Sequence, residues 1–131
     1  GYEISVDAYV SVEGNVKGIV MRKRDTVING ESQVTSSFRD EKMEGEFKRI
    51  LDALNLYGHV ILQAIISDNG ELFVVECNPR FGGASTLSVH IGLDSFYWAY
   101  LESMKVSIDN YPFIRSQKEA KQVRYPHDFY I

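Results

Sequence analysis

The chain has 131 residues, 44% of them apolar, which suits a single domain with a hydrophobic core. A formal net charge of −4, with the basic residues scattered, argues against nucleic acid as a partner. No apolar run is long enough for a membrane span, and no signal sequence opens the chain, so we expect no membrane partner. The lone cysteine, Cys77, lies in an apolar run; we expect a small buried side chain and a cytoplasmic protein.

The first part of the chain has the pattern of paired strands. Apolar and polar residues alternate from Glu3 to Glu13, as in a half-buried strand. Gly14-Asn15 is a turn signal, and the strand pattern resumes over residues 16–24, which predicts a β-hairpin. Asn29-Gly30 marks another turn, and residues 32–38 are expected to form a short strand.

If Gly14-Asn15 is a two-residue turn, Asp7 lies opposite Arg22 and Ser5 lies opposite Arg24. The polar face of this hairpin then carries two cations. A surface salt bridge, worth about 0–1 kcal/mol, is the ordinary interpretation of such a pair.

A helix is predicted next. Asp40 is suited to its N-cap, and Gly58 lies just past its expected end. Apolar residues recur at helical spacing between them. They are Phe47, Ile50, Leu51 and Leu54.

A second hairpin is predicted where residues 60–67 and 71–78 flank Asp68-Asn69-Gly70. A two-residue turn at Asn69-Gly70 places Gln63 directly opposite Glu76, with Asn78 on the same face. The other face is apolar and is expected to be buried in the core. Its members are Val60, Leu62, Ala64, Ile66, Phe73, Val75 and Cys77.

The last part of the chain is expected to contain two helices and a strand. After a flexible Gly82-Gly83 loop, one helix begins at Ser85 or Thr86 and reaches about His90. Asp94 can cap another, and residues 122–131 are rich in strand-forming residues. The apolar residues of the second helix are Phe96, Tyr97, Leu101 and Met104. Together these elements predict an α+β fold, an antiparallel sheet of hairpins with helices on one face.

The face with Gln63, Glu76 and Asn78 gathers one carboxylate and two amide oxygens. Hard divalent cations prefer oxygen ligands, and magnesium takes only a few from protein. An ordinary polar pair on a solvated sheet face is the alternative interpretation. The three histidines are spread too widely to suggest a metal cluster, and we expect each to be structural or on the surface.

Residues 76–83, Glu-Cys-Asn-Pro-Arg-Phe-Gly-Gly, read together with Gln63 and residues 3–7, resemble the ATP-grasp superfamily, in particular its carbamoyl-phosphate-synthase-like branch. The likeness extends over nearly the whole chain and includes residues 30–32 and 123–125. One position departs from the pattern, because some relatives have asparagine where this chain has Ile61. The resemblance implies that residues 1–131 are the C-terminal part of an ATP-grasp domain.

The resemblance also implies the ligands of ATP and Mg²⁺. Gln63 and Glu76 would bind one magnesium ion, and Glu76 and Asn78 a second; Mn²⁺ could substitute. Two ions are therefore expected beside the triphosphate.

Nucleotide-binding residues are implied on the same face. Arg80 and Arg22 would face the transferring phosphoryl group as catalytic residues, and Arg24 would lie over the triphosphate. Glu3 aligns with a carboxylate that accepts hydrogen bonds from the ribose. Gly82-Gly83, beside Arg80, would offer a site for an acyl phosphate or an acceptor substrate.

The implied activity is that of an ATP-dependent carboxylate ligase of the carboxylate-amine type, in which ATP phosphorylates a small carboxylate and a nucleophile attacks the acyl phosphate. The alternative is a non-catalytic nucleotide-binding or assembly module that retains the fold. The family's lysine-bearing strand, glycine-rich loop and adenine hinge are not in this chain. We therefore expect that it needs an N-terminal subdomain and that the isolated chain is inactive.

Overall fold

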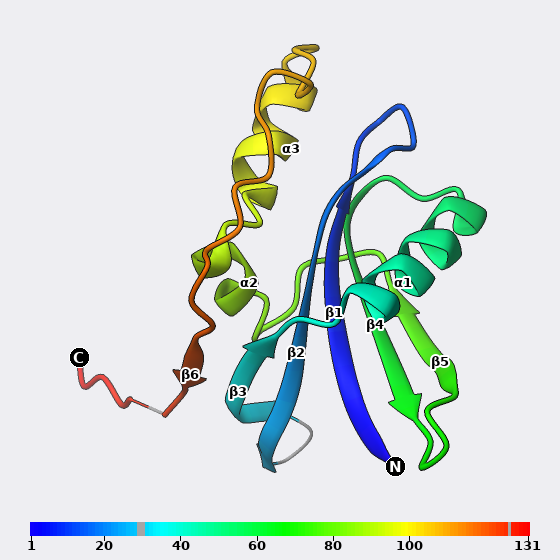
Figure 1. Ribbon diagram of the computed structural model, residues 1–131. Coiled ribbons are helices and arrows are strands. Elements are labelled where there is room, and N and C mark those ends of the chain that lie inside the picture. Colours follow the sequence, from blue (N-terminus) through cyan, green and yellow to red (C-terminus); the bar gives the residue numbers. More distant parts are fainter. Residues whose placement is uncertain (29–30, 126) are drawn as a thin grey trace.

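The computed structural model describes residues 1–28, 31–125 and 127–131, and it contains one antiparallel sheet with three helices in these residues (Figure 1). The strand order is β5-β4-β1-β2-β3-β6. The strands are β1 (Tyr2–Val10), β2 (Val16–Ile28), β3 (Glu31–Phe38), β4 (Gly58–Ile66), β5 (Leu72–Asn78) and β6 (Lys121–Val123). The helices are α1 (Glu41–Leu54), α2 (Thr86–Ile91) and α3 (Ser95–Ser103). The predicted α+β class and antiparallel hairpins are confirmed.

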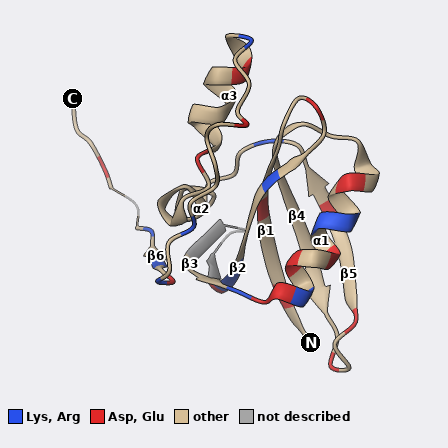
Figure 2. Ribbon diagram, turned by 45° about the horizontal axis from the view of Figure 1, so that its top comes forward, with Lys and Arg blue, Asp and Glu red and all other residues tan. Residues whose placement is uncertain are grey.

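Helix α1 covers one face of the sheet. Asp40 is its N-cap as predicted, and its carboxylate accepts a hydrogen bond from the Met43 amide at 3.0 Å. Acidic and basic residues alternate along its outer side (Figure 2), while Phe47 and Leu51 are buried against the strands. The strand residues of this core are Ile4, Val6, Ala8, Val10, Met21, Val60, Leu62, Ala64 and Ile66.

Helices α2 and α3 lie on the opposite face, so the expectation that helices cover only one face is wrong (Figure 1). Tyr9 and Val20 present apolar surface there, and Trp98 of α3 packs on Tyr9 with ring centroids 5.5 Å apart. The other members of this second core are Ile91, Leu93, Leu101 and Ile108. Both sides of the central strands are thus buried, and the free part of the second face is confined to the region beside α2. No helix among the described residues is long and apolar enough to cross a membrane.

The register of the first hairpin differs from the prediction. Ser11 and Asn15 close a three-residue loop in which Gly14 has φ +91°, and an irregularity follows between Tyr9 and Val10. These two features shift the pairing, so that Ser5 rather than Asp7 lies opposite Arg22.

The second hairpin reaches the predicted pairing by an unexpected route. Its loop also has three residues, because Ser67 pairs with Glu71, and Gly70 has φ +82°. Val75 is then an extra residue on β5, and this bulge restores the pairing of Gln63 with Glu76. The prediction for that pair is confirmed.

The predicted burial of β5 is wrong for two reasons, the three-residue loop and the position of β5 at the edge of the sheet. Phe73 pairs with Ile65 and therefore lies on the opposite face from the one expected. Phe73 and Val75 are about half exposed, at 53% and 56%, and Cys77 is exposed as well. A strand at the edge of the sheet has a neighbour on one side only, so its apolar side chains receive less cover.

Three further expectations need correction. Helix α1 ends at Leu54, and its C-cap is Asn55 in the left-handed conformation with φ 59°, so the helix stops before the predicted end beside Gly58. In α3 the buried aromatic residue is Trp98, whereas Phe96, Tyr97 and Met104 are exposed. The predicted final strand, residues 122–131, contains only the end of β6. The Asn29-Gly30 turn lies outside the described residues.

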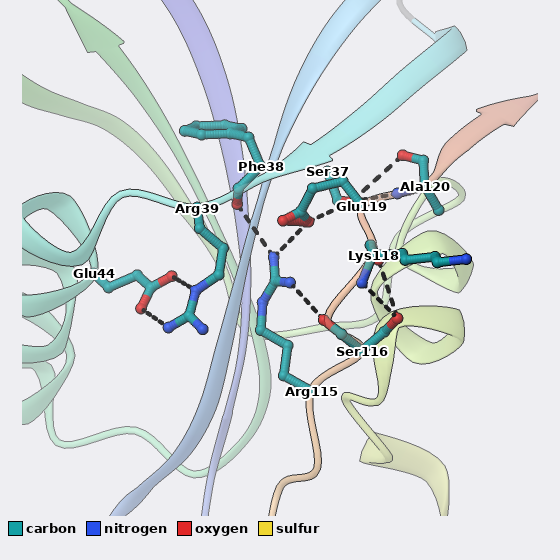
Figure 3. A network of polar contacts seen from close by, with 9 residues as sticks. All are labelled: Ser37, Phe38, Arg39, Glu44, Arg115, Ser116, Lys118, Glu119 and Ala120. Carbon is teal, nitrogen blue, oxygen red and sulfur yellow. Dashed lines mark hydrogen bonds and ion pairs between the residues drawn. The ribbon is translucent and has the colours of Figure 1, made fainter.

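A polar network attaches the C-terminal segment to β3 (Figure 3). The Arg115 guanidinium donates to the Phe38 carbonyl at 3.3 Å and to Glu119 at 2.8 Å. Ser37 donates to the same carboxylate at 2.9 Å, and its backbone amide donates to the Ala120 carbonyl. Burial would raise the pKa of Glu119, but the hydrogen bonds from Arg115 and Ser37 outweigh it and lower the pKa. The network leads the chain into β6 beside the sheet.

Candidate functional site

A polar cavity of about 270 Å³ lies on the second face of the sheet, between the central strands and the loop that follows β5. Four arginines from three separate parts of the chain contribute to its wall. The lining residues are Ser5, Arg22, Arg24, Ile61, Gln63, Asn78, Arg80, Gly82, Gly83, Ala84 and Arg124. Such a wall is suited to a ligand that carries several negative charges.

The predicted metal ligands are brought to one side of this cavity. Gln63 lies directly opposite Glu76, and Asn78 is paired with Ile61 two residues further along β5. Gln63 and Asn78 are half-buried in the cavity wall, whereas Glu76 is exposed beside it. One carboxylate and two amide oxygens are a donor set that fits a hard divalent cation such as magnesium. Among the described residues no group of three or more His, Cys, Asp and Glu side chains is gathered for a metal.

Two of the predicted nucleotide-binding residues contact one another. Arg24 donates to Glu3 at 2.8 Å, and the Glu3 side chain is 46% exposed. The register shift of the first hairpin produces this pair, which the sequence pattern did not predict. Arg24 lines the cavity and Glu3 flanks it.

Arg22 forms a buried ion pair with the carboxylate of Asp7. Its Nε donates to Asp7 at 2.7 Å, and Asp7 also accepts from His59 Nε2 at 2.9 Å and from the hydroxyls of Ser85 and Ser88 at 2.6 Å each. Burial would raise the pKa of Asp7, but the His59 hydrogen bond and the Arg22 charge outweigh it and hold the pKa well below its usual range. His59 is structural, in agreement with expectation.

The loop after β5 packs tightly at both glycines. A Cβ at Gly82 would lie 2.6 Å from the Ile61 side chain, and one at Gly83 would lie 3.0 Å from the Arg124 guanidinium. Arg80 is exposed at the cavity, and its Nη1 donates to the Phe81 carbonyl at 3.3 Å. The packing of this loop against Ile61 and Arg124 therefore leaves little room for a side chain at either position.

Sequence reasoning missed Arg124 and the role of Asp7. Arg124 belongs to the 123–125 segment of the resemblance but received no role, because nothing local places it at the cavity. The sequence pattern suggests that Asp7 belongs to a surface ion pair. In the structure it is fully buried and accepts hydrogen bonds from residues of β2, β4 and α2 with its N-cap. Its only local signal is a charged residue inside an otherwise well-formed strand pattern.

Comparisons with known proteins agree on one fold. The family described as ATP-grasp in the biosynthetic pathway with Ter operon matches residues 1–125. No curated protein matches.

Among solved structures, the biotin carboxylase domain of Hydrogenobacter thermophilus 2-oxoglutarate carboxylase, in complex with MgADP, ADP and bicarbonate, is 16% identical with a TM-score of 0.78. Campylobacter jejuni biotin carboxylase in complex with a β-γ-ATP is 14% identical with a TM-score of 0.75. In each, 94% of this chain covers 29% of the other. Rhizobium etli pyruvate carboxylase is 18% identical, with a TM-score of 0.72 and coverage of 94% and 14%. The chain thus spans less than a third of these structures, and identities this low show the fold alone.

Proposed function

Since the chain belongs to the ATP-grasp family, we propose that residues 1–131 form the C-terminal part of the ATP-grasp domain of an ATP-dependent carboxylate ligase. The observation that carries the proposal is the convergence of Gln63, Asn78 and Arg80 on one cavity with Glu76 beside it. These are the positions where the sequence resembles the family most specifically. The fold and the ligase-type architecture are common to the solved relatives.

In the proposed mechanism Gln63, Glu76 and Asn78 would hold two magnesium ions, and manganese could replace them. When bound, these ions would neutralise charge on the phosphate oxygens. Glu76 is the only carboxylate of the three, so it supplies the negative charge that balances the cations. The two amides add oxygen ligands without adding charge.

The arginines orient and stabilise the phosphoryl group. Arg22 from β2 and Arg80 from the loop after β5 both line the cavity, and each guanidinium can donate to oxygens on which charge develops. When ATP is bound, Arg24 would lie over the triphosphate, and Glu3 would accept hydrogen bonds from the ribose hydroxyls. The site contains no nucleophile of its own in this scheme, because positioning and charge neutralisation suffice for phosphoryl transfer. The product would be an acyl phosphate, which an amine attacks.

The finer parts of the proposal are the small-carboxylate substrate, the carbamoyl-phosphate-synthase-like branch, a cytoplasmic location and an N-terminal subdomain that completes the nucleotide site. They follow from the sequence resemblance and the lone cysteine. The biotin carboxylase likeness supports the fold and leaves the acceptor open.

The experiment is an assay of the full-length gene product with ATP, Mg²⁺ and a panel of small carboxylates. We expect release of ADP that depends on one carboxylate, and a hydroxamate when hydroxylamine is added to trap the acyl phosphate. ATP binding with neither product would contradict the ligase and favour the non-catalytic nucleotide-binding module.

A further inference from the structure

Two buried serines make the same kind of hydrogen bond to the same carboxylate. Ser85 donates to Asp7 Oδ1 and Ser88 to Asp7 Oδ2, both at 2.6 Å, and all three residues are fully buried. Hydrogen bonds to a charged acceptor are stronger than neutral ones. Asp7 on β1 therefore fixes the start of α2 firmly against the sheet.

Only Ser85 continues the connection toward the cavity. Its hydroxyl oxygen accepts a hydrogen bond from the Gly82 amide at 3.1 Å, and its own amide donates to the Gly82 carbonyl at 3.1 Å. Ser88 makes no such contact with the loop. The chain of hydrogen bonds from Asp7 through Ser85 to Gly82 will be called the relay.

The Asp7 carboxylate also fixes the orientation of Arg22, whose Nε donates to Oδ2. Because the bond is to Nε, the two terminal amino groups of Arg22 remain for the cavity that this residue lines. Within the described residues Asp7 is the only ion-pair partner of Arg22. One buried carboxylate thus determines both the direction of a guanidinium and the position of the loop backbone that faces it.

Stability alone does not account for this arrangement. A buried ion pair loses hydration, and apolar side chains of similar volume are often as stabilising. An apolar group, however, gives no fixed orientation to Arg22 or to the Gly82 amide.

We propose that Asp7 is a positioning residue and that Ser85 transmits its position to the Gly82-Gly83 backbone, so that this backbone and Arg22 meet the transferred phosphate in one fixed geometry. The ligand in this statement rests on the proposed function. The order of the loop does not, and it can be measured without any substrate.

The test compares Ser85→Ala with Ser88→Ala in the full-length gene product. Each variant loses one hydroxyl and one 2.6 Å bond to Asp7, so thermal unfolding should show both to be less stable than the wild type; Ser85→Ala also removes the acceptor of the Gly82 amide. Amide hydrogen exchange is then measured in the peptide that covers residues 80–86. We expect exchange at Gly82 to rise by about tenfold or more in Ser85→Ala, because its acceptor is gone, and to stay within about twofold in Ser88→Ala.

Equal exchange at Gly82 in the two variants would overturn the proposal. Ser85→Cys keeps a weak acceptor at the same position, and we expect it to recover part of the protection; no recovery would also count against the relay. These hydrogen-exchange results do not depend on catalysis.

A kinetic comparison follows if the wild type is an active ligase. Ser85→Ala should lower kcat by about tenfold with a smaller change in the KM for ATP, because misplaced groups cost rate more than affinity. Ser88→Ala should keep kcat within about twofold. Loss of kcat to the same extent in both variants would overturn the positioning role, whereas an inactive wild type would count against the proposed function and leave the exchange result valid.

Discussion

Gln63 on β4 and Glu76 on β5 are direct cross-strand partners, and a bulge at Val75 is what brings them into register. Without that extra residue the three-residue loop would place Gln63 opposite Val75. The face that carries Asn78 and the cavity would then lose its carboxylate. The predicted magnesium site therefore depends on one irregularity in an edge strand.

Replacing Glu76 with Gln should reduce ligase turnover by at least about 100-fold. Loss of a residue that only hydrogen-bonds to a metal ligand costs up to about 100-fold, and Glu76 is proposed to bind the metal directly. The amide keeps the shape but removes the only charge in the donor set. Because Glu76 is exposed, circular dichroism and thermal unfolding should be unchanged. Glu71→Gln, an exposed acid at the hairpin loop, is the matched control and should be fully active. Normal turnover in Glu76→Gln would mean that the metal assignment is wrong.

The Arg80→Ala variant should lower kcat more than it raises the KM for ATP. The guanidinium is exposed at the cavity, and within the described part of the chain its one hydrogen bond is to the neighbouring Phe81 carbonyl, so we expect folding not to depend on it. Its role in the proposal is to stabilise charge that develops during transfer. Steady-state kinetics separates the two parameters. An unchanged kcat with a large rise in KM would make Arg80 a simple phosphate anchor.

Asp7→Asn should destabilise the fold by about 3–5 kcal/mol near neutral pH, because the buried Arg22 loses its counter-charge. Asp52→Asn is the control: its pair with Lys48 is on the surface, and the expected loss is below about 1 kcal/mol. Urea unfolding of both variants and the wild type measures the difference.

The pH dependence gives Asp7 a second test. The pKa of Asp7 is lowered in the folded state, so its contribution to stability is complete above the ordinary carboxyl pKa of about 4. It is lost as the pH falls below that value toward the folded pKa. Wild-type stability should therefore decrease more steeply than that of Asp7→Asn as the pH is lowered below about 4. Parallel curves for the two proteins would contradict the shift.

Two glycine substitutions should have opposite effects. Gly92 ends α2 with φ +123°, and an added Cβ would clash with the Ile114 carbonyl oxygen, so Gly92→Ala should destabilise by more than about 1 kcal/mol. Gly45 lies inside α1 with open space around it, and Gly45→Ala should stabilise by about 0.5–1 kcal/mol. Thermal unfolding of the two variants shows whether each substitution raises or lowers the stability. A stable Gly92→Ala protein would mean that the junction between α2 and α3 can rearrange.

Residues 1–131 expressed alone should fold but bind MgATP only weakly, with a Kd on the order of millimolar. Both hydrophobic cores are contained in this segment. The cavity is open to solvent, where charge pairs are screened and weak. Cooperative thermal unfolding checks the fold, and calorimetry checks the affinity. Micromolar binding or ATP turnover would show that a second subdomain is not required.

Local patterns in the sequence were sufficient for the hairpins and the Asp40 cap, whereas the predicted opposition of Gln63 and Glu76 holds only because the bulge at Val75 offsets the three-residue loop. Strand alternation, helical spacing and turn residues are properties of near neighbours, so a single chain displays them directly. Strand alternation also placed Asn78 on the face of Glu76, whereas Arg80, which follows β5, was singled out only by the resemblance to the ATP-grasp family. The local patterns did not reveal the bulge at Val75, because a bulge depends on how the partner strand is paired.

Tertiary structure alone decided the role of Asp7, the position of Arg124 and the exposure of β5. Asp7 meets Ser85 across 78 positions of sequence and His59 across 52, and no local period encodes contacts at that separation. Its burial also depends on α2 covering the second face of the sheet. A carboxylate inside a strand is costly to bury, and only the four donors assembled by the fold make its ionised form stable.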